Sequence, residues 1–149
     1  MPRHRPAIAA MAVWTGLRCN GRMMKDPAAF LRTLFDTAIG AADPAQCVPP
    51  HLPPRPVGRI VVVGAGKAAA AMARAAEDHY GDDIGGAVIV PYGHGVACTR
   101  IRVIEAAHPV PDEAAAVAAR ALLTAVEGLT REDLVIALMS GGGSALMAM

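Results

Sequence analysis

The chain has 149 residues, of which 54% are hydrophobic and 18% charged, with a formal net charge of +1. This is about one domain with enough apolar side chains to bury a core, which excludes an intrinsically disordered chain. The balanced charge and the 3% aromatic content exclude the basic, stacking surface that nucleic-acid-binding proteins use.

Hydropathy and cysteine spacing exclude further classes of protein. No apolar run approaches the roughly 18 residues that a membrane span requires, so no membrane partner is expected. The three cysteines are far apart and lack CxxC spacing, which argues against a zinc site or a disulfide framework. We therefore expect a protein of the reducing cytoplasm without a metal site of its own.

Residues 1–24 contain four arginines and no acidic residue, with a weak apolar stretch over 7–14. A targeting peptide can have this composition. However, Met23 and Met24 lie directly before a helix start, so we interpret 1–24 as a disordered extension or a mis-called translation start. The domain itself is expected over residues 25–149.

A helix is predicted from Asp26 to about Ala42. Asp26 can cap its N-terminus, a proline follows at the first helical position, and apolar residues then recur at helical spacing. Residues 43–58 contain six prolines. Prolines at this density neither continue a helix nor pair inside a sheet, so this segment is predicted to be an extended connector.

From residue 59 onward, apolar strands alternate with helices. Strands are predicted at 59–63, 86–90, 101–106 and 134–139, and helices at 67–80 and from the capping residue Asp112 to about Glu127. This order predicts a Rossmann-like three-layer α/β/α fold with a mostly parallel sheet, incomplete at the C-terminus. Ligands of such sheets bind at the carboxyl ends of the strands, where the loops following these strands lie.

The first candidate site is the glycine turn between strand 59–63 and helix 67–80. Gly64, Gly66 and the alanines after them fit the G-x-G-x-x-A variant of a nicotinamide-binding turn. That function needs an acidic residue at the end of the second strand, which instead ends Val90-Pro91-Tyr92. The Walker A pattern is also absent. A tight turn that only packs an alanine-rich helix against the sheet is the structural alternative.

Lys67 directly follows this turn. A lysine in the first helical turn opposes the helix dipole at a cost of about 0.3–1 kcal/mol, and a bound anion would offset that cost. Lys67 is therefore a candidate anion ligand, and the alternative is a lysine that simply extends into solvent.

The second candidate site follows the buried strand 134–139. Ser140, Gly141, Gly142, Gly143 and Ser144 expose backbone N–H groups and two hydroxyls at a helix start, a combination suited to phosphate. A hydrolase nucleophile elbow would need G-x-S-x-G, whose last glycine is missing here. A flexible turn is the remaining alternative, although consecutive glycines are entropically costly and favour close approach to a ligand.

Two histidines and a cysteine lie in the neighbouring loops. His108 belongs to the proline-rigidified segment 108–112, where it either faces the ligand or bonds to local backbone. His94, between two glycines, is the weaker candidate, and neither histidine has a metal-ligand partner at useful spacing. Cys98 is expected to be inert.

Several segments in order resemble one family, the glycerate 2-kinases with a C-terminal MOFRL domain, which are often labelled hydroxypyruvate reductases. The similarity extends from about residue 25 to the end. The matching segments are 62–68 (VVGAGKA), 92–95 (YGHG), 103–113 (VIEAAHPVPDE) and 133–146 (DLVIALMSGGGSAL). The histidine-proline and triple-glycine segments are the specific ones.

The resemblance implies ATP-dependent phosphorylation of D-glycerate to 2-phosphoglycerate, with Mg²⁺ as the partner of the nucleotide. Lys67 matches the catalytic lysine of the family, and segment 140–144 matches its phosphate-binding loop. The family's active site lies between two domains, and the chain ends within the first. We therefore expect part of a kinase that is inactive alone. An NAD(P)H-dependent hydroxypyruvate reductase and a non-catalytic fragment or pseudogene product are the alternatives.

Overall fold

The computed structural model describes residues 18–19, 22–23 and 26–148. Most of the extension expected over 1–24 therefore lies outside the described residues, except for the two-residue strands β1 (Arg18–Cys19) and β2 (Arg22–Met23), which pair antiparallel. The chain divides into two compact units, residues 1–39 and 40–149. We describe the two units separately.

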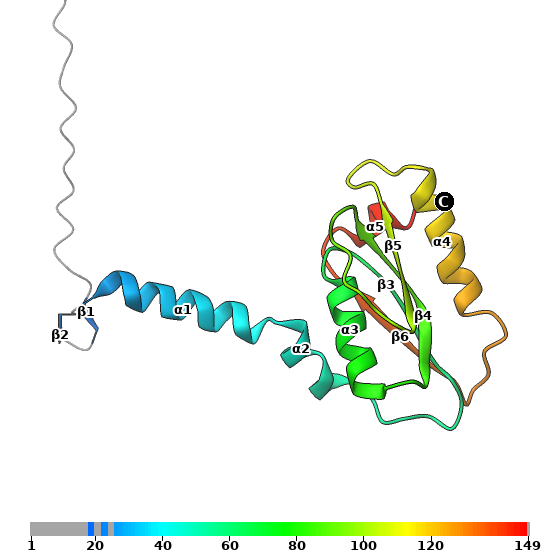
Figure 1. Ribbon diagram of the computed structural model, residues 1–149, viewed down its shortest axis with the longest axis horizontal. Coiled ribbons are helices and arrows are strands. Elements are labelled where there is room, and N and C mark those ends of the chain that lie inside the picture. Colours follow the sequence, from blue (N-terminus) through cyan, green and yellow to red (C-terminus); the bar gives the residue numbers. More distant parts are fainter. Residues whose placement is uncertain (1–17, 20–21, 24–25, 149) are drawn as a thin grey trace, which may run out of the picture. The chain divides into compact units, whose positions relative to one another are not determined.

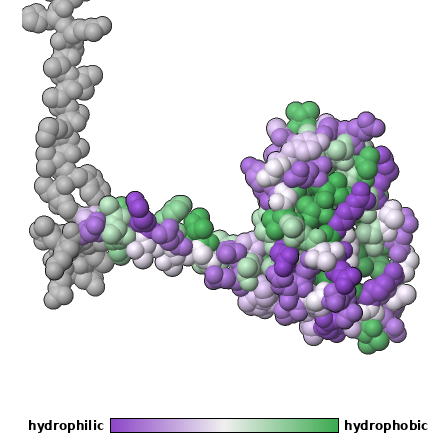
Figure 2. Space-filling view, in the orientation of Figure 1, coloured by the Kyte–Doolittle hydropathy of each residue, from purple (hydrophilic) through white to green (hydrophobic). Residues whose placement is uncertain are grey.

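Helix α1 (Pro27–Ala41) begins where the sequence predicts. The Oδ1 atom of Asp26 accepts a hydrogen bond of 2.9 Å from the Ala29 N–H, as an N-cap does. None of the residues of α1 is buried. Its apolar side chains recur along the helix among polar ones (Figure 2).

The proline-rich segment is not fully extended, and that expectation was wrong. It contains the short helix α2 (Pro44–Cys47) and the 3₁₀ turn η1 (Pro49–His51). Both begin with proline, which is compatible with the first helical positions because their N–H groups would be unpaired in any case. Asp43 caps α2 by accepting a hydrogen bond of 3.0 Å from the Ala45 N–H.

The second unit is built on a four-stranded sheet in the order β5-β4-β3-β6. All three neighbouring pairs are parallel, which confirms the predicted fold class. The prediction of β5 (Ile101–Ala106) and β6 (Leu134–Met139) was correct to the residue. Strand β3 (Ile60–Ala65) begins one residue and ends two residues later than predicted. Strand β4 (Ile84–Pro91) begins two residues earlier and ends one residue later than predicted.

Helices cover both faces of this sheet (Figure 1). Helix α3 (Ala69–Tyr80) packs its alanines on one face, and α4 (Glu113–Ala125) with α5 (Gly143–Leu146) packs on the other. The predicted cap of α4 is present, because Asp112 Oδ1 accepts a hydrogen bond of 3.0 Å from the Ala115 N–H. Helix α3 begins two residues later than predicted. Within the described residues, no helix is long and apolar enough to cross a membrane.

Candidate nucleotide site at the ends of β3 and β6

The two glycine turns meet at one point of the sheet. Strands β3 and β6 are parallel neighbours, with Ala65 opposite Met139 at their carboxyl ends. From these ends the chain leads into helices on opposite faces, α3 after β3 and α5 after β6. This is a topological switch point, the position at which open α/β sheets bind their ligands.

Hydrogen bonds join the two turns directly. The Ser140 Oγ atom accepts a hydrogen bond of 3.1 Å from the Ala68 N–H, and the Ser140 N–H donates to the Ala65 carbonyl at 3.0 Å. Gly66 has a φ of +120°, and a Cβ atom there would lie 2.2 Å from the Ser140 Oγ. Glycine is therefore required at this position for both conformation and space.

Two of the predicted site glycines face other backbone groups. Gly64 lies inside β3, where a Cβ atom would come within 2.3 Å of the Leu138 carbonyl oxygen on β6. Gly143 is buried at the start of α5, and a Cβ atom there would lie 2.9 Å from the Ala65 carbonyl oxygen. The structure therefore uses both glycines for close backbone packing beneath the loop.

The remaining residues of the second turn are accessible. Gly141 and Ser144 are exposed. A Cβ atom on Gly141 would meet no atom within 4 Å. Gly142 has a φ of +84° and forms the left-handed start of α5. These three residues form the surface of the turn that a ligand can reach.

His108 joins this turn from a distant part of the sequence. A Cβ atom at Gly142 would lie 2.7 Å from the His108 Nε2 atom, so the imidazole lies beside the second glycine turn. Asp112 holds the loop in place by accepting hydrogen bonds from the Ala107 N–H at 3.3 Å and the Tyr92 hydroxyl at 2.8 Å. The pKa of Asp112 is lowered, and the hydrogen bond from Tyr92 is the largest cause.

Lys67 occupies the turn between β3 and α3. Its side chain is exposed, and within residues 26–148 none of the ion pairs includes it. Because α3 begins at Ala69, Lys67 precedes the first helical turn, in which it was expected. In the chain, Lys67 lies between Gly66 of the first glycine turn and Ala68, the N-cap position of α3. An anion bound at this helix start would favour a cation in that position.

Glu105 has a role that was not predicted from the sequence. Its Oε1 atom accepts hydrogen bonds of 3.1 Å from the N–H groups of both Gly93 and Gly95, which orders the loop around His94. The signal that could have indicated it is a pair of glycines separated by one residue, followed by an acidic residue near the end of the next strand. Burial of Cys98 raises its thiol pKa to about 11, in agreement with the expected inertness.

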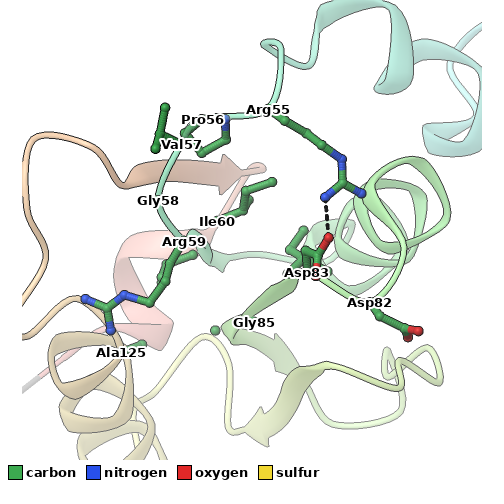
Figure 3. A pocket seen from close by; sticks show the side chains of 13 residues that line it. Arg55, Pro56, Val57, Gly58, Arg59, Ile60, Asp82, Asp83, Gly85 and Ala125 are labelled. Atoms are coloured by element: carbon green, nitrogen blue, oxygen red, sulfur yellow. Dashed lines mark hydrogen bonds and ion pairs between the residues drawn. The ribbon is translucent and has the colours of Figure 1, made fainter.

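A cavity of about 580 Å³ lies at the opposite edge of the sheet, against the amino ends of β3 and β4. Figure 3 shows Arg55 and Asp83 pointing toward each other at its wall, 2.7 Å apart. The other two charged residues of its lining, Arg59 and Asp82, pair with Asp133 and Arg100, which lie outside the lining. The cavity is remote from the glycine turns. Among the residues that the structure describes, no three His, Cys, Asp or Glu side chains are grouped to hold a metal ion.

The parallel sheet and the paired turns at its switch point define a Rossmann-like α/β domain. The chain belongs to the DUF4147 family, which is described as a domain of unknown function, and the family model matches residues 30–149.

Relatives with more specific names are considerably longer. An Agrobacterium vitis protein named "Putative hydroxypyruvate reductase" is 53% identical over 118 residues, covering 78% of this chain and 27% of the relative. The D-glycerate 2-kinase of Thermotoga maritima is 40% identical over 111 residues, which cover 73% of this chain and 27% of the relative. A crystal structure of glycerate kinase from the same organism matches with a TM-score of 0.66 at 34% identity. The match covers 79% of this chain and 30% of the chain in that structure. The chain thus spans less than a third of these relatives, in their N-terminal part.

Proposed function

We propose that this chain forms the N-terminal part of an ATP-dependent glycerate 2-kinase, which converts D-glycerate and ATP to 2-phosphoglycerate and ADP. The observation that carries the proposal is the junction of two glycine turns at the switch point, with the exposed Lys67 beside it. The name of the Thermotoga maritima relative supports the same reaction.

The chemistry matches what the junction offers. In phosphoryl transfer, the glycerate hydroxyl oxygen forms a bond to the γ-phosphorus, and the bond from that phosphorus to the β–γ bridging oxygen breaks. ADP leaves with the bridging oxygen, and the hydroxyl proton is released to solvent. Catalysis consists mainly of positioning and of neutralising the phosphoryl oxygens. In this proposal Lys67 supplies the positive charge. The accessible residues of the second turn hold the phosphate oxygens, and His108 borders them.

Mg²⁺ belongs to this proposal as the partner of the nucleotide. When ATP binds, the ion would supply positive charge that offsets the negative charge of the phosphates. Because the described residues contain no group of side chains arranged to hold a metal ion, we assign no protein ligand to it. In this part of the chain, the residues act on the phosphates themselves.

The name of the Agrobacterium vitis relative raises a second candidate, the reduction of hydroxypyruvate. A nicotinamide cofactor would need an acidic side chain at the end of β4 to hold its ribose hydroxyls. Strand β4 ends at Pro91, with Tyr92 next, and the nearby Glu105 carboxylate already accepts hydrogen bonds from two backbone N–H groups. The kinase reaction is therefore the better supported of the two.

A chimera can decide between these functions. Residues 26–149 would replace the corresponding segment of the Agrobacterium vitis relative, and both ATP-dependent phosphorylation of D-glycerate and NADH-dependent reduction of hydroxypyruvate would be measured. We expect phosphorylation only, and none from the 149-residue chain alone. Reduction of hydroxypyruvate without phosphorylation would overturn the proposal.

A further inference from the structure

Ser140 is bonded to both glycine turns. Its Oγ atom accepts from the Ala68 N–H at 3.1 Å and its N–H donates to the Ala65 carbonyl at 3.0 Å, which ties it to the first turn. Within its own turn, the Ser140 carbonyl accepts a hydrogen bond of 3.3 Å from the Gly143 N–H. One residue therefore connects the end of β3, the start of α3 and the start of α5.

The residue that Ser140 holds is the neighbour of Lys67. Ala68 is the N-cap position of α3, and its own side chain cannot cap the helix. The Ser140 hydroxyl oxygen approaches this helix start from another strand and fixes the peptide group between Lys67 and Ala68. On the other side of Lys67, the Gly66 carbonyl accepts a hydrogen bond of 3.1 Å from the Ala69 N–H, and the Gly66 N–H donates to the Ile89 carbonyl at 3.0 Å. The backbone of Lys67 is thus held at both ends.

We propose that Ser140 is a positioning residue for the phosphoryl transfer, and that it acts by holding the Lys67 turn in place. The proposal rests on the kinase function proposed above. The fit between the turns is close, since a Cβ atom at Gly66 would lie 2.2 Å from the Ser140 Oγ. A lysine displaced by a loosened turn would neutralise the transferred phosphoryl group less well, and such displacement is costly in catalysis.

The first test measures the turn without any ligand. In the chimera, Ser140→Ala removes the acceptor of the Ala68 N–H, and hydrogen exchange of peptides covering 66–69 is followed by mass spectrometry. We expect exchange about fivefold to tenfold faster, the usual effect of losing one hydrogen bond. The control Ser144→Ala alters an exposed hydroxyl of the same loop and should leave this exchange unchanged. Unchanged exchange in Ser140→Ala overturns the proposal.

The second test is a double-mutant cycle on kcat. Ser140→Ala should lower kcat about fivefold to tenfold in the unmutated background and produce no further loss in the Lys67→Ala background, because the two changes remove one coupled contribution. An equal loss in both backgrounds would show that Ser140 acts independently of Lys67, which overturns the proposal. If the unmutated chimera phosphorylates no glycerate, the kinase function fails, and the exchange experiment alone decides whether Ser140 holds the turn.

Discussion

The Glu77 carboxylate in α3 accepts a hydrogen bond of 2.6 Å from the backbone N–H of Ile101, the first residue of β5. The same carboxylate accepts from the N–H groups of Thr99 and Arg100 at 2.9 and 2.5 Å. Glu77 is the buried charged residue of the described core. Its acceptor oxygens satisfy three donors at the start of the edge strand, and so they attach β5 to the helix that covers it.

The substitution Glu77→Gln should therefore destabilise the domain. An amide offers one acceptor oxygen and turns an N–H₂ group toward the remaining donors, so we expect a loss of about 2–4 kcal/mol in the free energy of unfolding. Urea denaturation of the chimera measures it. Asp78→Asn, on the exposed side of the same helix, is the matched control and should change the stability by less than about 0.5 kcal/mol.

The same carboxylate makes the stability depend on pH. Burial raises the pKa of Glu77, but the three N–H donors together outweigh burial and bring it below the ordinary value of 4.5. A carboxyl group with a lowered folded-state pKa stabilises the fold above its unfolded-state pKa, and this contribution is lost as the pH falls through the folded-state pKa. Unfolding midpoints should thus fall below pH 4.5 in the unmutated protein. The loss should be smaller in Glu77→Gln, where the lowered pKa values of Asp112 and Asp133 still contribute. A loss as large as that of the unmutated protein would contradict the assignment to Glu77.

Lys67→Ala tests the proposed catalytic lysine in the chimera. We expect kcat for glycerate phosphorylation to fall roughly a hundredfold or more, as when one preorganised electrostatic group is removed. The melting temperature should stay unchanged, because the side chain is exposed and lies outside α3. Arg120→Ala, an exposed cation on α4, should leave kcat intact. Near-normal kcat with earlier melting in Lys67→Ala would make the lysine structural.

The stability costs of two substitutions, Gly66→Ala and Gly81→Ala, should distinguish backbone strain from steric conflict. Both glycines have positive φ values, +120° and +70°, but only Gly66 would place its Cβ atom against another residue, Ser140. We expect Gly81→Ala to cost about 1–2 kcal/mol from strain alone. Gly66→Ala should cost at least about 1–3 kcal/mol more, since overpacking adds to strain. Equal urea midpoints for the two variants would refute the close contact between the turns.

Strand β6 should govern the association of the 149-residue chain. Val135 and Met139 on one face of β6 are 44% and 49% exposed, whereas Leu138 on the other is 7% exposed. An exposed apolar edge strand pairs readily with other chains, and a charge on it prevents such pairing. We therefore expect the 149-residue chain to associate in solution, and Val135→Lys to lower the apparent mass measured by light scattering while the domain stays folded. Leu138→Lys should unfold the domain, as expected for an unpaired charge in the core.

Cys98 should react slowly with alkylating reagents. Its pKa of about 11 leaves little thiolate at neutral pH, whereas Cys47 is exposed. Peptide mapping after a timed iodoacetamide treatment should show that Cys98 is labelled roughly ten times more slowly than Cys47, or slower still. The labelling rate of Cys98 should increase as the pH rises toward 11. Equal labelling of the two cysteines at neutral pH would contradict the burial of this thiol.

Local sequence patterns determined most of the secondary structure. Asp26 and Asp112 cap their helices as predicted, because an N-cap needs only the side chain and the backbone that follows it. The bounds of β6 follow from an uninterrupted apolar run. The proline-rich segment was misjudged where proline begins a short helix, since a local rule that excludes helix interiors says little about their first positions.

The sequence also placed both glycine turns at the ends of strands, but only the tertiary structure decided how they are used. Strand order brings β3 beside β6 across about 70 intervening residues, so that Gly64 faces Leu138 and Ser140 reaches Ala68. Both turns look alike in sequence, as glycines beside small residues. A neighbouring strand supplies the backbone groups that decide which glycine is needed for close packing and which hydroxyl holds a helix start. The pairing of such distant strands is not encoded in any local pattern.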